Sequence, residues 1–352
     1  MGRRERFAEL MHRVGALGAA MELRRYAPGP ASVAILTYHH IADDDPAYPF
    51  DRTVADATPA QFRRQMELLA RYGTPIAMDD LIRALDGAPL PKNPVMVTFD
   101  DGYQSVHDIA VPILQRVGIP ATLFIATQFV AERRIYWWEA VAVILQRARR
   151  ARARVTYPET FELVAGEPGT AATVNDWIKN TPGLNVERLL AELAIGFDVE
   201  WNREVERTLA DRLIMSWDQI RGLAKAGIAI ESHSRSHRVL PTLDDAALRD
   251  DLRGAKRELE AQVGTPVRAL AYPVGRRIHD ERVRTAIRDA GYRVGLSNGS
   301  GQTQFWPGAM GKLRAVDPLD VRRLSTERTM SEAMWLTQVA LPPLAYINRY
   351  NR

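Results

Sequence analysis

The sequence predicts an α/β fold built on a parallel sheet, and three observations support this. Short runs of apolar residues, each the length of a buried strand, alternate along the chain with helical patterns. Polar clusters come directly after several of these runs. Most of the predicted helices are followed by a glycine, at Gly73, Gly118, Gly227, Gly264 and Gly291. Repeated strand–helix units form either a doubly wound sheet or a closed barrel, and both place their chemistry at the carboxyl ends of the strands.

The first part of the chain contains three predicted strands and the helices between them. The strands are expected where β-branched and other apolar residues cluster, over 32–38, 94–99 and 121–126. One helix opens with Thr58 as its N-cap and Pro59 in its first turn, and it ends at Gly73. The next helix ends near Val117, directly before a glycine.

The alternation breaks off at about residue 133 and resumes at about residue 213. We interpret 133–213 as a mainly helical insertion, in which Trp137-Trp138 leads one helix and another covers about 186–213. Beyond the insertion, strands are expected over 228–231, 267–271 and 293–296. Helices are expected over 216–227, 244–263 and 280–290.

Three segments make up the chain on this interpretation. Residues 1–30 form an amphipathic leader whose apolar side chains recur every three to four positions, and it ends at Pro28-Gly29-Pro30. Residues 31–330 form the main domain with its insertion. Residues 331–352 form a second amphipathic segment, broken by Pro342-Pro343. We expect both ends to pack on the main domain, with contact to a membrane surface as the alternative.

Neither a secretory signal nor a membrane-spanning run is evident in the sequence. Charged or polar residues, among them Glu9, His12 and Arg13, interrupt the apolar pattern at the N-terminus. No apolar run reaches the ~20 residues that a spanning helix needs. We therefore expect a cytoplasmic protein, with peripheral contact at the inner membrane surface as a variant of that expectation.

The composition limits the chemistry that the chain can support. Its 352 residues include 47 Lys+Arg, 43 Asp+Glu, seven His and no Cys. Disulfides, thiolate metal sites, iron–sulfur clusters and a cysteine nucleophile are excluded, so His, Asp and Glu must bind any metal. The densest basic run, from Arg147 to Arg154, is expected to be an exposed helix end and loop, with an anionic polymer or membrane surface as an alternative partner. No nucleic-acid-binding module accompanies this run, so nucleic acid is not an expected partner.

The first polar cluster, Thr98 to Tyr103, places two adjacent carboxylates at the end of a predicted core strand. Asp100 and Asp101 do not stay ionised side by side unless a cation joins them or one of the two pKa values is raised. Alternation along the strand sends their side chains in different directions, so one can bind a metal while the other acts as a base. Gly102 permits an unusual turn directly after them. A surface turn without function is the plainer interpretation of Asp-Asp-Gly.

The second cluster, Glu231 to His237, puts two histidines four residues apart beyond a predicted strand. If the segment turns helically, His233 and His237 reach one point, at a spacing typical of divalent-metal sites. If it does not, they are unrelated surface histidines. A His–His–Asp site keeps an open coordination position for water, as catalytic zinc requires. The third cluster, Tyr272 to Arg276, is by itself only a turn after a strand.

Taken in this order, the three clusters resemble the motifs of the polysaccharide deacetylase family, the carbohydrate esterases that share a NodB-type catalytic domain. The resemblance covers about residues 30–330 without the insertion. Thr98-Phe99-Asp100-Asp101-Gly102 matches the first motif of the family, and Ser232-His233-Ser234-Arg235-Ser236-His237 matches the second. The resemblance implies a distorted (β/α)7 barrel in which Asp100 is the catalytic base. It also implies a bound divalent metal, with Zn²⁺ as the expected ion, whose ligands are Asp101, His233 and His237.

The third motif departs from the family pattern. The family has an Arg two residues before the Pro and an aromatic residue before the Gly, where this chain has Ala271 and Val274. We therefore expect another group, Arg276 or Arg277, to orient the base.

The late Leu-x-His motif, which supplies the family's general acid, is absent. Circularly permuted members place that last strand first and end it in Tyr-His, and Tyr38-His39-His40 fits this variant. His39 is thus the expected general acid, with His40 as a substitute. The resemblance further implies an oxyanion-binding backbone N–H near Tyr103 and substrate contacts from Tyr272, Pro273 and Trp306. Trp137 and Trp138 are candidates to stack on sugar rings, with packed core as the alternative.

These assignments predict metal-assisted hydrolysis that removes N-acetyl groups from the amino sugars of a polysaccharide, an oligosaccharide or a lipid-linked glycan. O-deacetylation and deformylation of a sugar are alternatives within the enzyme class. A catalytically inactive carbohydrate-binding barrel is the alternative outside it, and the missing Arg of the third motif favours that alternative. Phosphoryl transfer is disfavoured because no glycine-rich phosphate loop is present. The identity of the sugar and the oligomeric state stay open.

Overall fold

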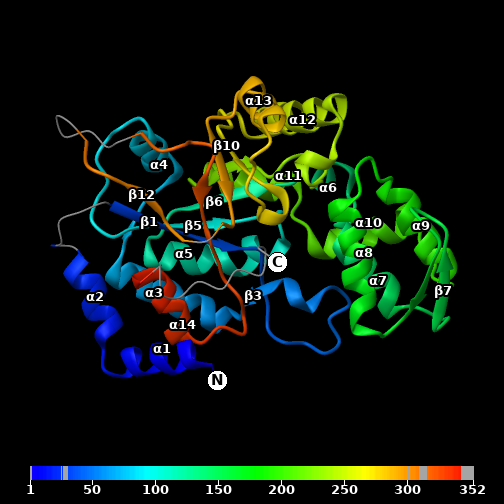
Figure 1. Cartoon of the computed structure of the whole chain (residues 1–352), viewed down its shortest axis with the longest axis horizontal. Helices are drawn as coiled ribbons and strands as arrows, with labels where there is room; N and C mark the ends of the chain where they lie inside the picture. The colour runs from blue at the N-terminus through cyan, green and yellow to red at the C-terminus, as the bar shows by residue number, and fades with distance from the viewer. Residues whose placement is uncertain (1, 25, 27–30, 300, 309–314, 342–352) are drawn as a thin grey trace.

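The computed structural model describes residues 2–24, 26, 31–299, 301–308 and 315–341, and its centre is a barrel of parallel strands with helices around it (Figure 1). Successive parallel strands pair around the barrel in the order β1 (Ala31–Tyr38), β5 (Pro94–Phe99), β6 (Ala121–Ile125), β9 (Ala229–Ser232), β10 (Ala269–Ala271) and β11 (Val294–Ser297). The strands expected from the apolar runs are thus all present.

A short segment near the end of the chain closes the barrel. β13 (Val321–Arg322) pairs in parallel with β11, and β14 (Leu324–Ser325) pairs in parallel with β1. The single residue between these two strands is Arg323. Together they occupy a seventh parallel position, so the expected distorted (β/α)7 barrel is confirmed. Two shorter strands extend the sheet: β4 (Thr74–Pro75) beside β5, and β12 (Thr303–Phe305), which runs antiparallel to the first residues of β1.

Alternation along the strands decides which side chains face the inside of the barrel. The smaller of two apolar clusters takes alternate strand residues, such as Val33, Ile35 and Met96, together with α4 (Met78–Leu85). The intervening residues belong to the larger cluster, which includes the surrounding helices. The inward series continues at the carboxyl ends to His39 and Asp100. Polar side chains at the carboxyl ends of different strands therefore lie together at one end of the barrel.

The helices around the barrel begin and end close to the expected residues. α3 (Pro59–Tyr72) starts with a capping box at Thr58, an arrangement that typically contributes ~1 kcal/mol. α5 (Val111–Val117) and α12 (Asp245–Val263) both end at a glycine in the left-handed conformation. The remaining helices of this group are α6 (Thr127–Glu132), α11 (Trp217–Lys225) and α13 (Glu281–Asp289).

The insertion lies to one side of the barrel (Figure 1) and is more broken than expected. It contains α7 (Trp137–Gln146), β7 (Arg152–Val155), β8 (Phe161–Val164), α8 (Pro168–Asn180), α9 (Val186–Gly196) and α10 (Arg203–Leu213). The single helix expected over 186–213 is wrong, because Asp198 adopts the left-handed conformation (φ 55°) and Asn202 caps a new helix. The basic run is only partly a helix end and loop, because its last residues form β7 and pair with β8.

Both ends of the described chain pack against the body of the protein. α1 (Arg3–Arg13) and α2 (Ala16–Arg24) contact α14 (Glu332–Ala340), and Leu17 and Met21 of α2 join the larger apolar cluster. The proposed end of the leader at 28–30 and the stretch beyond Leu341, with its two prolines, lie outside the described residues. Within the described part of the chain, no helix combines the length and apolar character needed to cross a membrane.

Candidate active site

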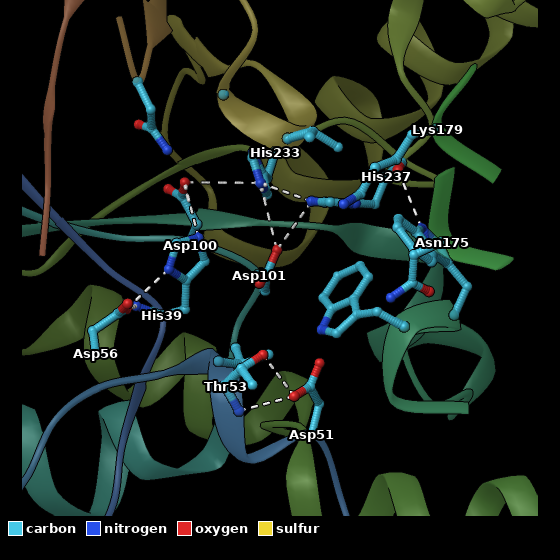
Figure 2. A pocket seen from close by; sticks show the side chains of 16 residues that line it. His39, Asp51, Thr53, Asp56, Asp100, Asp101, Asn175, Lys179, His233 and His237 are labelled. Carbon is cyan, nitrogen blue, oxygen red and sulfur yellow. Dashed lines mark hydrogen bonds and ion pairs between the residues drawn. The ribbon is translucent and has the colours of Figure 1, made fainter. Parts of the chain in front are cut away.

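A pocket opens at the carboxyl ends of the barrel strands, and four parts of the chain line it (Figure 2). The strand ends contribute five residues: His39, Asp100, Asp101, His233 and His237. The 51–56 loop contributes Asp51, Thr53, Val54 and Asp56, and the insertion contributes Trp137, Trp138, Asn175 and Lys179. The turns after β10 and β11 complete it with Val274, Gly275 and Asn298. The pocket therefore unites residues that the motifs had indicated with the 51–56 segment, Asn175, Lys179 and Asn298, which the sequence did not connect to them.

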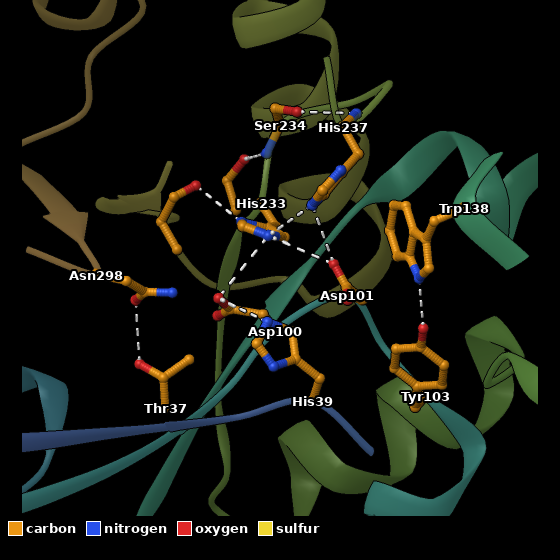
Figure 3. A network of polar contacts seen from close by, with 12 residues as sticks. Thr37, His39, Asp100, Asp101, Tyr103, Trp138, His233, Ser234, His237 and Asn298 are labelled. Atoms are coloured by element: carbon orange, nitrogen blue, oxygen red, sulfur yellow. Dashed lines mark hydrogen bonds and ion pairs between the residues drawn. The ribbon is translucent and has the colours of Figure 1, made fainter. Parts of the chain in front are cut away.

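Asp101, His233 and His237 converge on one point in this pocket (Figure 3). The two Nε2 atoms are 3.1 Å apart, and they lie 3.4 Å (His233) and 3.3 Å (His237) from Asp101 Oδ1. Ligands bound to zinc in tetrahedral geometry are roughly 3.3–3.4 Å from one another. Asp101 Oδ1 is buried and accepts no hydrogen bond within the described residues. The donor set and its spacing therefore fit a divalent cation.

The protonation of these three groups also suits a cation. His233 Nδ1 lies 2.9 Å from the carbonyl oxygen of Ala271 and donates to it, which leaves Nε2 with its lone pair facing the pocket. Burial lowers the pKa of His233 to about 4 and holds that of His237 well below its usual range, so both rings are neutral at neutral pH. Burial raises the pKa of the Asp101 carboxyl to about 7, which a neighbouring cation would reverse.

The two histidines meet through a loop, so they converge without the helical turn on which their meeting was predicted to depend. Residues 233–237 carry no helix, and Ser234 and His237 have positive φ values of 65° and 53°. Asp251 of α12 holds the loop by accepting the backbone N–H groups of Arg235 and Ser236. Asp101 is also left-handed, at φ 72°. The left-handed conformation raises the free energy of the folded state by about 1–3 kcal/mol for each non-glycine residue, and such residues cluster at functional sites.

Asp100 is held by an arginine that sequence reasoning missed. Arg323, fully buried between β13 and β14, donates from both terminal nitrogens to the two carboxylate oxygens, each at 2.7 Å. Burial alone would raise the pKa of Asp100, but the charge and hydrogen bonds of Arg323 outweigh it and hold the pKa well below its usual range. The expectation of Arg276 or Arg277 is wrong, because their guanidinium groups bond to Asn180 and Asp320 instead.

His39, not His40, faces the pocket. His39 Nδ1 lies 2.9 Å from Asp56 Oδ2, and its Nε2 is 3.9 Å from Asp100 Oδ2. Burial lowers the pKa of His39, but Asp56 and the two pocket aspartates outweigh it and raise the pKa to about 9. His40 points the other way, as alternation requires, and its ring nitrogens contact Ser105 Oγ and the Tyr48 hydroxyl.

Aromatic side chains form the wall on the insertion side. Trp137 and Trp138 line the pocket with small exposed fractions, 4% and 8%. Trp138 Nε1 donates to the Tyr103 hydroxyl (Figure 3). That hydroxyl in turn donates to the buried Glu139. The Tyr103 side chain thus supports Trp138 from behind and does not line the pocket. The oxyanion role expected of a backbone N–H near Tyr103 stays a prediction.

Three residues expected to contact substrate do not line this pocket. Trp306 follows Phe305, which pairs with Ala31 at the amino end of β1, so it lies at the opposite end of the barrel from His39. The Tyr272 side chain is buried and donates to the carbonyl oxygen of Leu319, and Pro273 is buried as well. The third cluster reaches the pocket through the next two residues, Val274 and Gly275.

Other pocket residues carried little signal in the sequence. Asp56 sits in a three-residue strand, β3 (Ala55–Ala57), which is too short for periodicity to reveal. Asn175 and Lys179 lie four residues apart on α8, a spacing that marks one helix face once the helix is known. Asn175 Oδ1 is buried without a hydrogen-bond partner within the described residues. Burial and the charge of Arg276 lower the pKa of Lys179.

Comparison with known proteins agrees with the motifs. The family model for polysaccharide deacetylases matches residues 87–161 and 168–295, which together make up more than half of the chain. A poly-β-1,6-N-acetyl-D-glucosamine N-deacetylase from Staphylococcus epidermidis is 27% identical over 108 residues, or 28% of this chain. The match spans only 37% of that relative's length.

Solved structures share the fold at low sequence identity. The Streptococcus pyogenes deacetylase PplD, solved in complex with acetate, aligns with a TM-score of 0.57 at 17% identity and covers 89% of this chain and 100% of its own. IcaB from Ammonifex degensii aligns with a TM-score of 0.53 at 16% identity and covers 90% of this chain and 98% of its own. At these identities, the similarities concern the fold.

Proposed function

This chain belongs to the polysaccharide deacetylase family, and from that premise we propose that it is a metal-dependent hydrolase of N-acetylated amino sugars. Its substrate would be a polysaccharide, an oligosaccharide or a lipid-linked glycan. The observation that carries the proposal is the Asp101–His233–His237 triangle, which faces the same pocket as Asp100 and His39. A cation site, a base and an acid would then act on one bound acetamido group.

The cation would be held by Asp101 Oδ1 and by the Nε2 atoms of His233 and His237. A divalent ion there, Zn²⁺ by our expectation, supplies Lewis-acid chemistry that polarises an amide carbonyl and acidifies water. The hydrogen bond from His233 Nδ1 to Ala271 fixes the orientation of one ring.

Asp100 is the proposed general base, which takes the proton of the attacking water. Its low pKa keeps the carboxylate ionised at neutral pH, and Arg323 fixes its orientation. Asp100 Oδ2 lies 3.9 Å from His39 Nε2 and 3.8 Å from His233 Nε2. These separations exceed hydrogen-bonding distance, so neither histidine donates a hydrogen bond to the base. A positioned base typically contributes about 10²–10⁴-fold to the rate.

His39 is the proposed general acid. Asp56 accepts a hydrogen bond from Nδ1–H of His39, which aims the protonated Nε2 at the pocket. The raised pKa of His39 keeps the Nε2 proton in place at neutral pH. The Nε2 proton passes to the sugar nitrogen as the C–N bond breaks, and the products are acetate and a free amine. A backbone N–H near Tyr103 is proposed to stabilise the charge that develops on the carbonyl oxygen.

The insertion would bind the sugar beside the reacting group. Trp137 and Trp138 offer apolar surface to a sugar ring. Asn175 Oδ1 and the Lys179 ammonium, both at the pocket, would receive and donate hydrogen bonds to hydroxyl groups.

The test is acetate and amine release from defined sugars by the full chain, with metal content measured in the same samples. The first substrate is a β-1,6-linked N-acetylglucosamine oligomer, as in the name of the Staphylococcus relative, followed by chitooligosaccharides. We expect N-deacetylation by the wild type, and an Asp100→Asn variant that keeps its metal but loses turnover. Release only from O-acetyl or N-formyl sugars would support those alternatives, and an inert protein that still binds sugar would support the binding barrel.

A further inference from the structure

Exposed apolar side chains are concentrated near the N-terminus. Within the described part of the chain, eight large apolar residues are exposed, and five of them lie in the first 26 residues. These are Phe7 (45%), Leu10 (59%), Val14 (66%), Leu23 (69%) and Tyr26 (83%). The other three are scattered over β8, α9 and the residue after β12. Contiguous exposed apolar surface commonly marks a contact with another molecule or a membrane.

Two of these side chains on α1 and a third at its C-cap, Val14, form one stripe. Phe7, Leu10 and Val14 are spaced by three and four residues, so they lie along the same side of the helix. Ala8, which is fully buried, lies on a different side. The helix therefore has two apolar sides, and only one of them packs against the part of the protein that the structure describes.

The charges along the stripe are all positive. With 3.6 residues per turn, Arg3, Arg6 and Arg13 fall within the same third of the helix circumference as the stripe, and all three are exposed. The acidic residues of the helix, Glu5 and Glu9, fall outside that sector. We call these six residues the outer face of α1: Arg3, Arg6, Phe7, Leu10, Arg13 and Val14.

Contacts on the inner side fix the direction in which the outer face points. His12 Nε2 on α1 lies 3.4 Å from Glu332 Oε1 on α14. Arg24, at the end of α2, donates to the carbonyl oxygens of Val339 and Ala340 at the end of α14. α1 and α2 lie at the edge of the molecule away from the insertion (Figure 1).

We propose that the outer face of α1 docks on a bilayer that contains anionic phospholipids. Its apolar side chains would enter the boundary between headgroups and acyl chains, and its arginines would meet the lipid phosphates. A second copy of this chain fits less well, because a two-fold contact of this face with itself brings arginine against arginine. The inference is independent of the proposed hydrolysis, since no residue of the outer face lines the catalytic pocket.

Sedimentation of the full chain with vesicles tests the apolar part of this contact. The wild type should sediment with vesicles of phosphatidylcholine mixed with phosphatidylglycerol, and far less with phosphatidylcholine alone. The triple variant Phe7→Ser/Leu10→Ser/Val14→Ser should lower the partition coefficient by about tenfold or more. Ile195→Ser, which removes an even more exposed apolar side chain from the insertion, is the control and should bind like the wild type.

A charge-reversed variant tests the electrostatic part. Arg3→Glu/Arg6→Glu/Arg13→Glu should abolish the preference for the anionic vesicles, while thermal unfolding and turnover of a soluble oligosaccharide stay unchanged. The proposal is overturned if the wild type sediments with neither vesicle, or if both triple variants sediment as it does. It is also overturned if light scattering finds a wild-type dimer that the serine variant dissociates, because the face would then join two copies.

Discussion

Arg323 and Asp100 form a bidentate ion pair, with two contacts of 2.7 Å between residues that are 223 positions apart in the sequence. Both side chains are buried, so neither charge is compensated by water. The segment that closes the barrel thus supplies the cation that the family pattern places where this chain has Ala271. Arg323 therefore replaces the missing arginine of the third motif, whose absence favoured an inactive barrel.

Removing the cation of this pair should disable the base. In Arg323→Met, the buried Asp100 carboxylate loses its bidentate partner, so its pKa rises and the acid limb of the activity profile moves to higher pH. We expect kcat/KM to fall by ~100-fold or more and the free energy of unfolding to drop by about 3–5 kcal/mol. Arg277→Met removes an arginine that pairs with Asp320 instead, and it should leave both quantities near the wild type. An active Arg323→Met enzyme would contradict the assignment.

Loading the apo protein with Zn²⁺ should raise its unfolding temperature, because a ligand that binds only the folded state stabilises it. The added free energy of unfolding is ~2.7 kcal/mol when the free Zn²⁺ concentration is a hundred times Kd. Calorimetry measures the shift and elemental analysis the stoichiometry. Asp101→Ala, His233→Ala and His237→Ala should each abolish both signals. His107→Ala, an exposed histidine outside the pocket, should keep them. Full metal occupancy in all three ligand variants would refute the site.

The His39–Asp56 pair should set the basic limb of the activity profile. Asp56 raises the pKa of His39, so Asp56→Asn should move the basic limb of kcat/KM to lower pH. A bound cation lowers the pKa of His39 in both proteins alike, so the difference between the two profiles reports on Asp56. If His40 were the acid, His40→Asn would shift the limb and His39→Asn would not.

The same pair predicts how stability depends on pH in the metal-free protein. The pKa of His39 is raised to about 9 in the folded state, against about 6.5 when unfolded. Its stabilisation is therefore complete below about pH 6.5 and is lost as the pH rises through about 9. Chemical denaturation should show the largest difference in unfolding free energy between wild type and Asp56→Asn near pH 6.5, and a smaller difference near pH 9. A difference that grows with pH would argue against a protonated His39.

The insertion residues should affect substrate binding more than chemistry. Lys179→Met and Asn175→Ala should each raise KM by roughly tenfold, because a hydrogen bond to a charged or buried group is lost, while kcat and metal content change little. Lys225→Met, on the exposed side of α11, is the control. Unchanged KM values in both pocket variants would show that Lys179 and Asn175 do not bind substrate.

The strands and the metal-binding residues could be predicted because their signals are local. Asp100-Asp101 directly follows an apolar run, and His233 and His237 follow another, so the parallel order of the strands alone brings them to one edge. The break within 186–213 carried a weaker local signal in Asn202, a good N-cap, which the longer apolar pattern masked. Trp306 was misplaced because residue type indicates affinity for sugar but not the end of the barrel at which a residue lies.

By itself, the sequence determined the strand–helix order, the chemistry of the strand ends and the three groups that would bind a cation, since each depends on neighbours within a few residues. Only the tertiary structure decided which arginine holds Asp100, which histidine faces the pocket and which wall the insertion forms. Arg323 reaches Asp100 because two very short strands close the barrel, and Asp56 selects His39 across a loop. Lys179 lies on α8, which packs against α7 of the insertion. Such contacts follow from closure and packing between distant segments, for which a local pattern contains no information.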